Sequence, residues 1–261
     1  MKFLKKSLGQ NFLRDNNIIK KILNTVKIKN KNIIEIGPGD GALTNQILNY
    51  KPKNLILIEK DFNLSSKLRF KFQKKKFVEV YCQDFLKFDL KNKIKEDTII
   101  FGNLPYNVSS QIFVKLIRLN KWPPKYSDVV LMFQKELGEK IIANFPSSNY
   151  GRLSILSNSI LKVKKKFLVS PNCFKPKPKV FSMVIHFRPK KEKNTNFKNI
   201  KNLEKITNIL FSNKRKMINK NLKKILNKDQ IDKIDGLKMN MRPSEIKPEL
   251  YYKITEIFEK K

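Results

Sequence analysis

Short apolar runs alternate with stretches long enough to form helices over the first two thirds of this chain. Each run has the length of a buried strand and is rich in branched aliphatic residues. Strands that alternate with helices predict a mostly parallel sheet with helices on both faces, because each crossover lays a helix against the sheet. We therefore expect an α/β fold. The predicted strands are 32–36, 54–58, 77–82, 98–101 and 128–133.

The pattern changes at both ends of this alternation. Residues 1–31 predict a basic arm followed by a helix that begins after Asp15, because apolar side chains then recur on one helical face. Two later runs, 166–169 and 180–187, flank a proline-rich connection. They predict an antiparallel pair at the edge of the sheet.

A polar and charged stretch, 189–198, has the composition of a linker. Beyond it the apolar residues follow a helical period. We therefore predict two domains, an α/β domain over 1–190 and a small all-α domain over 199–261. A chain of 261 residues is long enough to bury the core of both.

The net charge is 57 − 22 = +35, which favours a polyanionic partner such as a nucleic acid. Part of this excess is a lysine bias spread along the whole chain, which an AT-rich genome produces without function. The two cysteines are isolated, no apolar run has the length of a membrane span, and the N-terminus lacks a signal-peptide core. These features predict a cytoplasmic protein with no membrane partner. The single histidine, His186, excludes a Ser-His-Asp triad and a multi-histidine metal site, so we expect no metal.

A glycine-rich stretch, 35–42, follows the first predicted strand. Its glycines allow a tight turn and close approach of the backbone to a ligand. The pattern fits the relaxed dinucleotide fingerprint, with Gly37 as its first glycine, and it also fits the nucleoside loop of S-adenosylmethionine enzymes, in which Glu35 precedes the glycines. Glu59, at the end of the second strand, suits either template because its carboxylate can accept both ribose hydroxyls. A tight strand–helix turn without a ligand is the structural alternative.

Asp84 follows the third strand and can accept a hydrogen bond from an adenine amino group. Alone it is also a common helix cap. Its value comes from position, since the glycine loop, Glu59, Asp84 and Asn103 all follow successive predicted strands. Ligands of open α/β sheets bind at that edge.

The most informative stretch is Asn103-Leu104-Pro105-Tyr106, which follows the fourth strand. The side-chain oxygen of Asn103 and the main-chain carbonyl of Leu104 can each accept one N–H of an adenine amine. The nitrogen then becomes more tetrahedral, and its lone pair can attack a sulfonium methyl group. Pro105 restricts the direction of that carbonyl, and Tyr106 can stack on the base. The structural alternative is an ordinary turn at the end of a strand.

Two further motifs carry weaker signals. Phe174 opens a proline-rich loop and can cover the other face of a flipped base, although a core phenylalanine in a rigid connector is nearly as consistent with the pattern. The basic cluster Lys214-Arg215-Lys216 is expected to open a helix, where cations oppose the helix dipole and indicate a phosphate partner. A solvated face is the structural alternative.

These motifs together resemble the ribosomal RNA adenine dimethyltransferases, most closely those of the bacterial small subunit. The resemblance covers most of the first 190 residues, and the region around 214–222 and 241–246 also favours the small-subunit enzymes. The stretches that carry it are 9–13, 35–39, 58–59, 83–84, 102–106, 134–136, 150–154 and 174–180.

The resemblance implies a Rossmann-like class I methyltransferase domain and a C-terminal helical domain that recognises rRNA. It also implies an enzyme that transfers methyl groups from S-adenosylmethionine to two adjacent adenosines in a hairpin loop near the 3′ end of small-subunit rRNA, giving dimethyladenosines, with a role in small-subunit biogenesis. The residue roles that it implies are cofactor binding at Asn11, Leu13, Gly37, Glu59, Asp84 and Asn103.

The implied substrate is small-subunit rRNA within an immature subunit, bound by a monomer with no protein partner. Three alternatives remain. The large-subunit rRNA methyltransferases of macrolide resistance share the core motifs. A mainly non-catalytic assembly factor would bind immature subunits without needing the intact site. A DNA adenine methyltransferase would need a larger recognition domain than a helical tail of this size.

Overall fold

The computed structural model describes residues 11–119, 122–191 and 195–260, which form two compact units. Of these residues, the first unit contains 11–119, 123–138 and 163–189, and the second contains 122, 139–162, 190–191 and 195–260. The predicted domain boundary near 190–199 therefore accounts for only part of this division, because an earlier segment also belongs to the second unit. The segment 139–162 groups with the C-terminal helices, because its helix, residues 152–160, packs on two of them.

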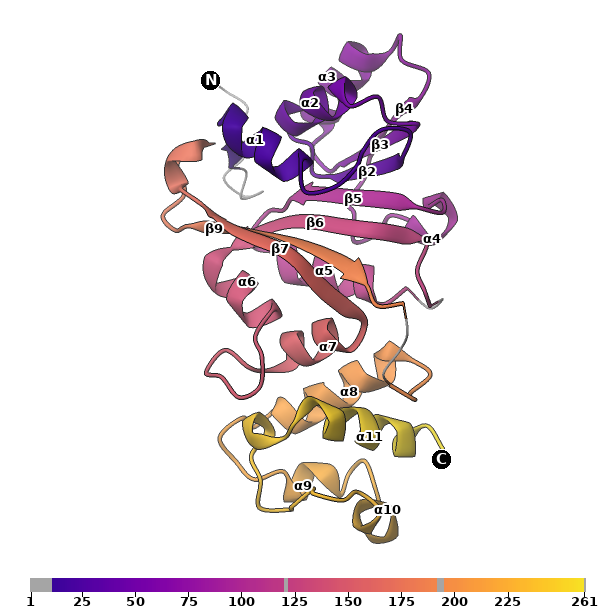
Figure 1. Cartoon of the computed structure of the whole chain (residues 1–261), viewed down its shortest axis with the longest axis vertical. Coiled ribbons are helices and arrows are strands. Elements are labelled where there is room, and N and C mark those ends of the chain that lie inside the picture. Colours follow the sequence, from indigo (N-terminus) through magenta and orange to yellow (C-terminus); the bar gives the residue numbers. More distant parts are fainter. Residues whose placement is uncertain (1–10, 120–121, 192–194, 261) are drawn as a thin grey trace. The chain divides into compact units, whose positions relative to one another are not determined.

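A seven-stranded sheet runs through the first unit in the order β4-β3-β2-β5-β6-β9-β7 (Figure 1). The five strands from β4 to β6 pair in parallel, as the alternating pattern predicts. β9 pairs antiparallel with β6, and β7 lies beyond it at the edge. The strands are β2 (Asn32–Ile36), β3 (Asn54–Glu59), β4 (Val78–Cys82), β5 (Thr98–Asn103), β6 (Tyr126–Gln134), β7 (Leu161–Val169) and β9 (Ser182–Pro189).

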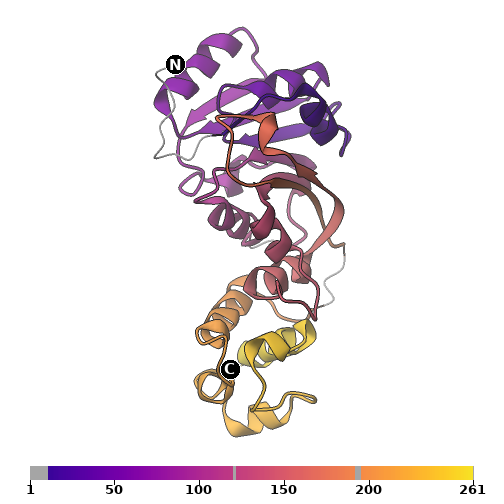
Figure 2. The same ribbon diagram turned by 90° about the vertical axis from the view of Figure 1, so that its left-hand side faces the viewer.

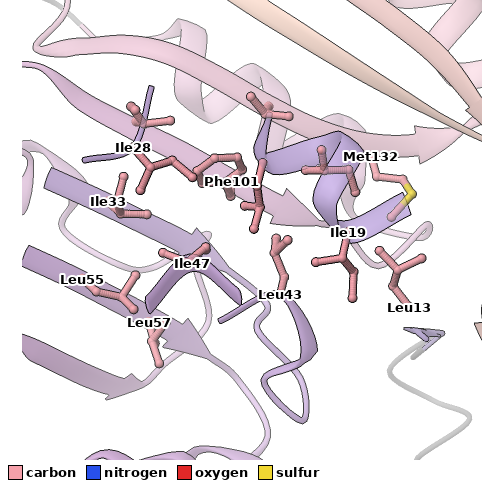
Figure 3. Close-up of a cluster of buried hydrophobic side chains, with 14 of the residues drawn as sticks. Leu13, Ile19, Ile28, Ile33, Leu43, Ile47, Leu55, Leu57, Phe101 and Met132 are labelled. Atoms are coloured by element: carbon pink, nitrogen blue, oxygen red, sulfur yellow. The ribbon is translucent and has the colours of Figure 1, made fainter. Parts of the chain in front are cut away.

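Helices cover both faces of this sheet. Apolar side chains of α1 (Asn16–Leu23), α2 (Ala42–Asn49) and α3 (Phe62–Phe72) join alternate strand residues in one buried cluster. Figure 3 shows part of this cluster, including Phe101 of β5 and Ile47 of α2. On the other face, Phe113 of α5 (Ser109–Ile117) packs against rings of β6 and β9. The remaining helices of this region are α4 (Leu90–Lys93) and α6 (Lys135–Ile141).

The N-terminal arm pairs with the connection between β7 and β9. This connection contains the 3-10 turn η2 (Pro171–Cys173). It projects beyond the ends of β7 and β9 in Figure 1, and that side of the molecule faces the viewer in Figure 2. The short strand β1 (Phe12–Leu13) pairs antiparallel with β8 (Phe174–Lys175). Directly after β1, the carboxylate of Asp15 accepts the amides of Asn17 and Ile18 and begins α1, as the sequence predicts.

The second unit is all-helical. Within it, α7 and α11 both pack on α8, and the hydroxyl of Tyr150 donates to the carbonyl of Ile246 at 2.9 Å. No helix in the described residues is long and apolar enough to cross a membrane. The elements are α7 (Arg152–Ile160), α8 (Ile200–Phe211), α9 (Asn219–Leu222), α10 (Lys228–Asp232), η3 (Pro243–Glu245) and α11 (Pro248–Phe258).

The core on the α1–α2 face should dominate the stability of the first unit. Phe101 is fully buried in it, so Phe101→Ala is expected to lower the free energy of unfolding by about 3–5 kcal/mol in urea titrations. Phe70→Ala on α3 is the matched control, because that ring is 76% exposed and its loss should change the free energy by less than about 0.5 kcal/mol. Equal losses in the free energy of unfolding for the two variants would contradict the assignment of Phe101 to the core.

Candidate active site

A cleft opens at the carboxyl ends of the parallel strands, within the first unit. It is lined by the arm, the glycine-rich turn, the end of β3 and the stretch that follows β5. This is the edge at which the sequence predicts a ligand. Of the predicted site residues, those that line it are Asn11, Leu13, Gly37, Glu59, Asn103, Leu104, Pro105 and Tyr106.

Strand register brings three polar side chains to the same face of the sheet. Glu35 of β2 lies beside Leu57 of β3 and Phe101 of β5. Glu59 and Asn103 come two residues after those partners, and side chains two residues apart on a strand share a face. All three therefore reach the cleft side, where α1 and α2 also lie.

The glycine-rich turn adopts a backbone that side chains rarely permit. Gly37, Gly39 and Gly41 have φ values of +65°, +61° and +85°, and Gly41 is the N-cap of α2. A Cβ added at Gly39 would lie 2.7 Å from the ring of Phe12. The turn therefore permits a ligand to approach its backbone closely, and the ring of Phe12 already lies against Gly39.

Glu59 supports the glycine-rich turn. One carboxylate oxygen accepts the amide of Gly39 at 2.9 Å, and the other accepts the amide of Asp61 at 2.9 Å. Burial raises the pKa of Glu59, while these hydrogen bonds oppose the rise. Each carboxylate oxygen has a second lone pair, so the group can still accept a ligand hydroxyl.

Glu35 is the most deeply buried acid at this edge. Burial raises its pKa to about 8, although the hydroxyl of Thr44 donates to it at 2.7 Å and opposes the rise. The side chain is therefore protonated at neutral pH. As a neutral group it links β2 to α2 through the hydrogen bond from Thr44, and it adds no negative charge to the cleft.

The side chain of Asn103 is held by the arm. Its amide nitrogen donates to the main-chain carbonyl of Asn11 at 3.0 Å. This contact uses the NH₂ end of the amide and sets the plane of the group. The side-chain oxygen, an acceptor, is the atom that remains for another donor.

Tyr106 is anchored at its hydroxyl, which lies 2.7 Å from the hydroxyl of the fully buried Ser182 on β9. Burial raises the pKa of Tyr106. The ring is therefore held at the wall of the cleft in its neutral form. Leu104 beside it is buried and lines the same cleft.

Asp84 follows β4 and already has two partners. Its carboxylate accepts the ammonium of Lys60 at 2.8 Å and the amide of Leu86 at 2.9 Å. Burial raises the pKa of Asp84, but the bonds to Lys60 and Leu86 outweigh it and the net shift is downward. The acid is thus held ionised beside Lys60, which itself lines the cleft.

Phe174 lies in the core, contrary to the prediction that it covers a target base. It is 6% exposed and belongs to the same buried cluster as Leu13, its cross-strand neighbour. The ring packs inward because β1 and β8 pair at this point. The structural alternative given by the sequence, a core phenylalanine in a rigid connector, is the arrangement observed.

Lys214, Arg215 and Lys216 also differ from expectation. They form an exposed turn between α8 and α9, not the start of a helix. The amide of Lys216 closes this turn on the carbonyl of Asn213 at 2.9 Å. The three cations nevertheless stay together on the surface of the second unit.

Several contributors to the cleft carry no signal in the sequence. Ser182 looks like any strand residue, and its role depends on pairing between β6 and β9. Phe12 lies within the stretch 9–13 and Asp40 within 35–42, but the sequence assigns no role to either, and both line the cleft. No group of three or more His, Cys, Asp or Glu side chains that could hold a metal ion occurs in the described residues.

Comparison with known proteins places this arrangement in a family. The model of a family described as ribosomal RNA adenine dimethylase matches residues 1–260. A protein of Pelagibacter ubique named ribosomal RNA small subunit methyltransferase A is 42% identical over 98% of this chain and 97% of its own length. A protein of Malacoplasma penetrans with the same name is 38% identical, over 97% of this chain and 91% of its own.

Solved structures show the same fold. A dimethyladenosine transferase from Plasmodium falciparum superimposes with a TM-score of 0.76 at 29% identity, over 93% of this chain and 95% of that one. The 23S rRNA methyltransferase ErmE superimposes with a TM-score of 0.67 at 22% identity, over 95% of this chain and all of that one. The Rossmann-like class I methyltransferase fold predicted from the sequence is confirmed.

The protonated state of Glu35 predicts a pH dependence of stability. Below about pH 4.5 the carboxyl is protonated in both folded and unfolded chains. As the pH rises to about 8, the unfolded chain loses this proton while the folded chain retains it, so the free energy of unfolding falls. Glu35→Gln should remove this loss, and its stability relative to wild type should rise across that window and then level off.

Urea unfolding at a series of pH values measures this difference. Glu136→Gln, which removes an exposed carboxyl on α6, controls for the loss of a charge. A constant difference between Glu35→Gln and wild type from pH 4.5 to 8 would show that Glu35 is ionised in the folded chain.

Proposed function

Because the chain belongs to the ribosomal RNA adenine dimethylase family, we propose that it dimethylates two adjacent adenosines in a hairpin loop near the 3′ end of small-subunit rRNA. It is an S-adenosylmethionine-dependent rRNA adenine dimethyltransferase. The observation that carries the proposal is the amide of Asn103, fixed through its nitrogen and with its oxygen available at the cleft.

The residues of the cleft suit an adenosyl ligand. The left-handed backbone of Gly37 permits close approach, and the carboxylate of Glu59 has lone pairs left for ribose hydroxyls. We assign Gly37 to the methionine end, Glu59 to the ribose and Asp84 to the adenine. Asn11 and Leu13 cover the ligand from the arm. When bound, S-adenosylmethionine supplies a methyl group on a positively charged sulfur.

The chemistry assigned to Asn103 and Leu104 needs no strong base. The side-chain oxygen of Asn103 and the carbonyl of Leu104 accept the two N–H groups of the adenosine amine, which directs its lone pair outward. That lone pair forms the new N–C bond as the S–C bond breaks and its electron pair passes to sulfur. The same oxygens stabilise the positive charge that develops on nitrogen, before one proton is lost to solvent.

Tyr106 is the ring that we assign to stacking on the target base. Its hydroxyl is tied to Ser182, so the ring keeps its position without the target and loses little conformational freedom on binding. Pro105 precedes it and restricts the backbone of Leu104. The pocket for the amine is therefore largely formed before the substrate arrives.

The rRNA must also be held outside the cleft. We assign Lys214, Arg215 and Lys216 to phosphate contacts, since they are exposed together and the chain carries a net charge of +35. The protein is an rRNA-modifying enzyme, and we propose that its substrate form is an immature small subunit in the cytoplasm, bound by a monomer. The names of the relatives support small-subunit over large-subunit rRNA.

Asn103→Ala should reduce methyl transfer to immature small subunits by at least about 100-fold, because the developing charge on the amine loses one of its two acceptors. Binding of rRNA should stay within about 2-fold of wild type, since its phosphate contacts lie elsewhere. Incorporation of labelled methyl groups and a filter-binding assay measure the two properties.

The matched control is Asn63→Ala, which removes an exposed amide from α3. It should transfer methyl groups at the wild-type rate. Asn103→Ala with wild-type activity would contradict the role assigned to the amide oxygen.

Replacement of Lys214, Arg215 and Lys216 by glutamine should weaken rRNA binding and flatten its salt dependence. Each phosphate contact that is lost should reduce the slope of log affinity against log salt by about 1. Binding titrations at about 50 to 300 mM salt, a range over which phosphate contacts weaken, measure the slope. The control replaces Lys74, Lys75 and Lys76, an exposed lysine cluster of the first unit. Equal slopes for the two variants would assign the binding to overall charge instead.

A further inference from the structure

The arm, residues 11–14, contacts two further segments besides Asn103. Its main chain is bonded to the β7–β9 connection: the amide of Arg14 donates to the carbonyl of Cys173 at 2.8 Å, and Leu13 pairs with Phe174. The side chains of Phe12 and Arg14 contact the glycine-rich turn instead. The arm therefore bridges two segments that are far apart in the sequence.

The contact with the glycine-rich turn centres on Arg14. Its guanidinium lies 2.5 Å from the carboxylate of Asp40 and 5.6 Å from the centroid of the Phe12 ring. The ring of Phe12 in turn occupies the space beside Gly39 that any side chain at that position would fill. An ion pair, a cation–π contact and a close packing contact thus lie together.

These contacts lie at the wall of the cleft. Phe12 and Asp40 both line it, and Asp40 is held between two glycines whose backbone conformation is fixed by the turn. A ligand that enters or leaves between the arm and the turn must separate Arg14 from Asp40. The bonds between the arm and β8 need not break in that movement.

We propose that Arg14 and Asp40 form a latch that sets the rate at which S-adenosylmethionine enters the cleft and S-adenosylhomocysteine leaves it. The inference rests on the proposed function, which supplies the ligand. Arg14 acts as a positioning residue, since it holds the arm and takes no part in the methyl transfer. The sequence alone assigns no role to Asp40.

The exposure of the pair makes this latch weak enough to open. The side chains are 49% and 29% exposed, and ion pairs of this kind contribute little in water. A modest contact suits a site that must exchange its ligand after every methyl transfer. Loss of the pair should therefore change ligand release by about 2- to 5-fold, and not abolish binding.

The test follows the release of radiolabelled S-adenosylhomocysteine from the full chain into an excess of unlabelled ligand. Arg14→Met and Asp40→Asn should each release it about 2- to 5-fold faster than wild type, and the variant with both changes no faster than either. The charge exchange Arg14→Asp with Asp40→Arg should restore slow release. Added salt should speed release from wild type but not from the single variants.

Lys31→Met is the matched control. Lys31 also forms an exposed ion pair, with Asp97, but this pair lies at the amino ends of β2 and β5, away from the cleft. Its release rate should equal that of wild type. Wild-type release from Arg14→Met and Asp40→Asn, or fast release from the charge-exchanged variant, would overturn the latch. A wild-type chain that retains no S-adenosylhomocysteine would instead overturn the proposed function.

Discussion

The parallel register of β2, β3 and β5 is the constraint on which the site depends. Glu35 is level with Leu57 and Phe101, so Glu59 and Asn103 end their strands on the same face. A shift of one residue in β5 would turn both Asn103 and Phe101 to the face covered by α5. The buried cluster on the α1–α2 face opposes such a shift, because each strand contributes alternate apolar residues to it. The packing that stabilises the sheet thus also sets the position of the reactive amide.

The sequence was sufficient for those parts of the structure that depend on local patterns. The parallel strands, the cap at Asp15 and the turn around Gly37 follow from apolar periodicity, side-chain capping and backbone freedom, all of which act over a few residues. The common edge of the strands then brings the motifs together, because parallel strands present their carboxyl ends on one side. This is why the order of the motifs along the chain is enough to assign Glu59 and Asn103 to one cleft.

Contacts between distant segments could not be predicted in this way. The bond between Tyr106 and Ser182 depends on the position of β9, and the burial of Phe174 depends on the pairing of β8 with the arm. A phenylalanine among prolines has the same local pattern whether it faces a ligand or the core. The same limit applies to 139–162, which lies between strands β6 and β7 in the sequence but groups with the C-terminal helices.

The arm connects the retention of a ligand with the geometry of the reactive amide. Asn11 holds the nitrogen of Asn103, and Arg14, three residues later, is paired with Asp40. Between these two contacts the main chain of Phe12 and Leu13 pairs with β8, which keeps the arm in place when Arg14 separates from Asp40. Asn103 therefore keeps the bond that sets its amide plane while the ion pair opens. Exchange of the ligand and orientation of the reactive amide thus depend on separate contacts of one short segment.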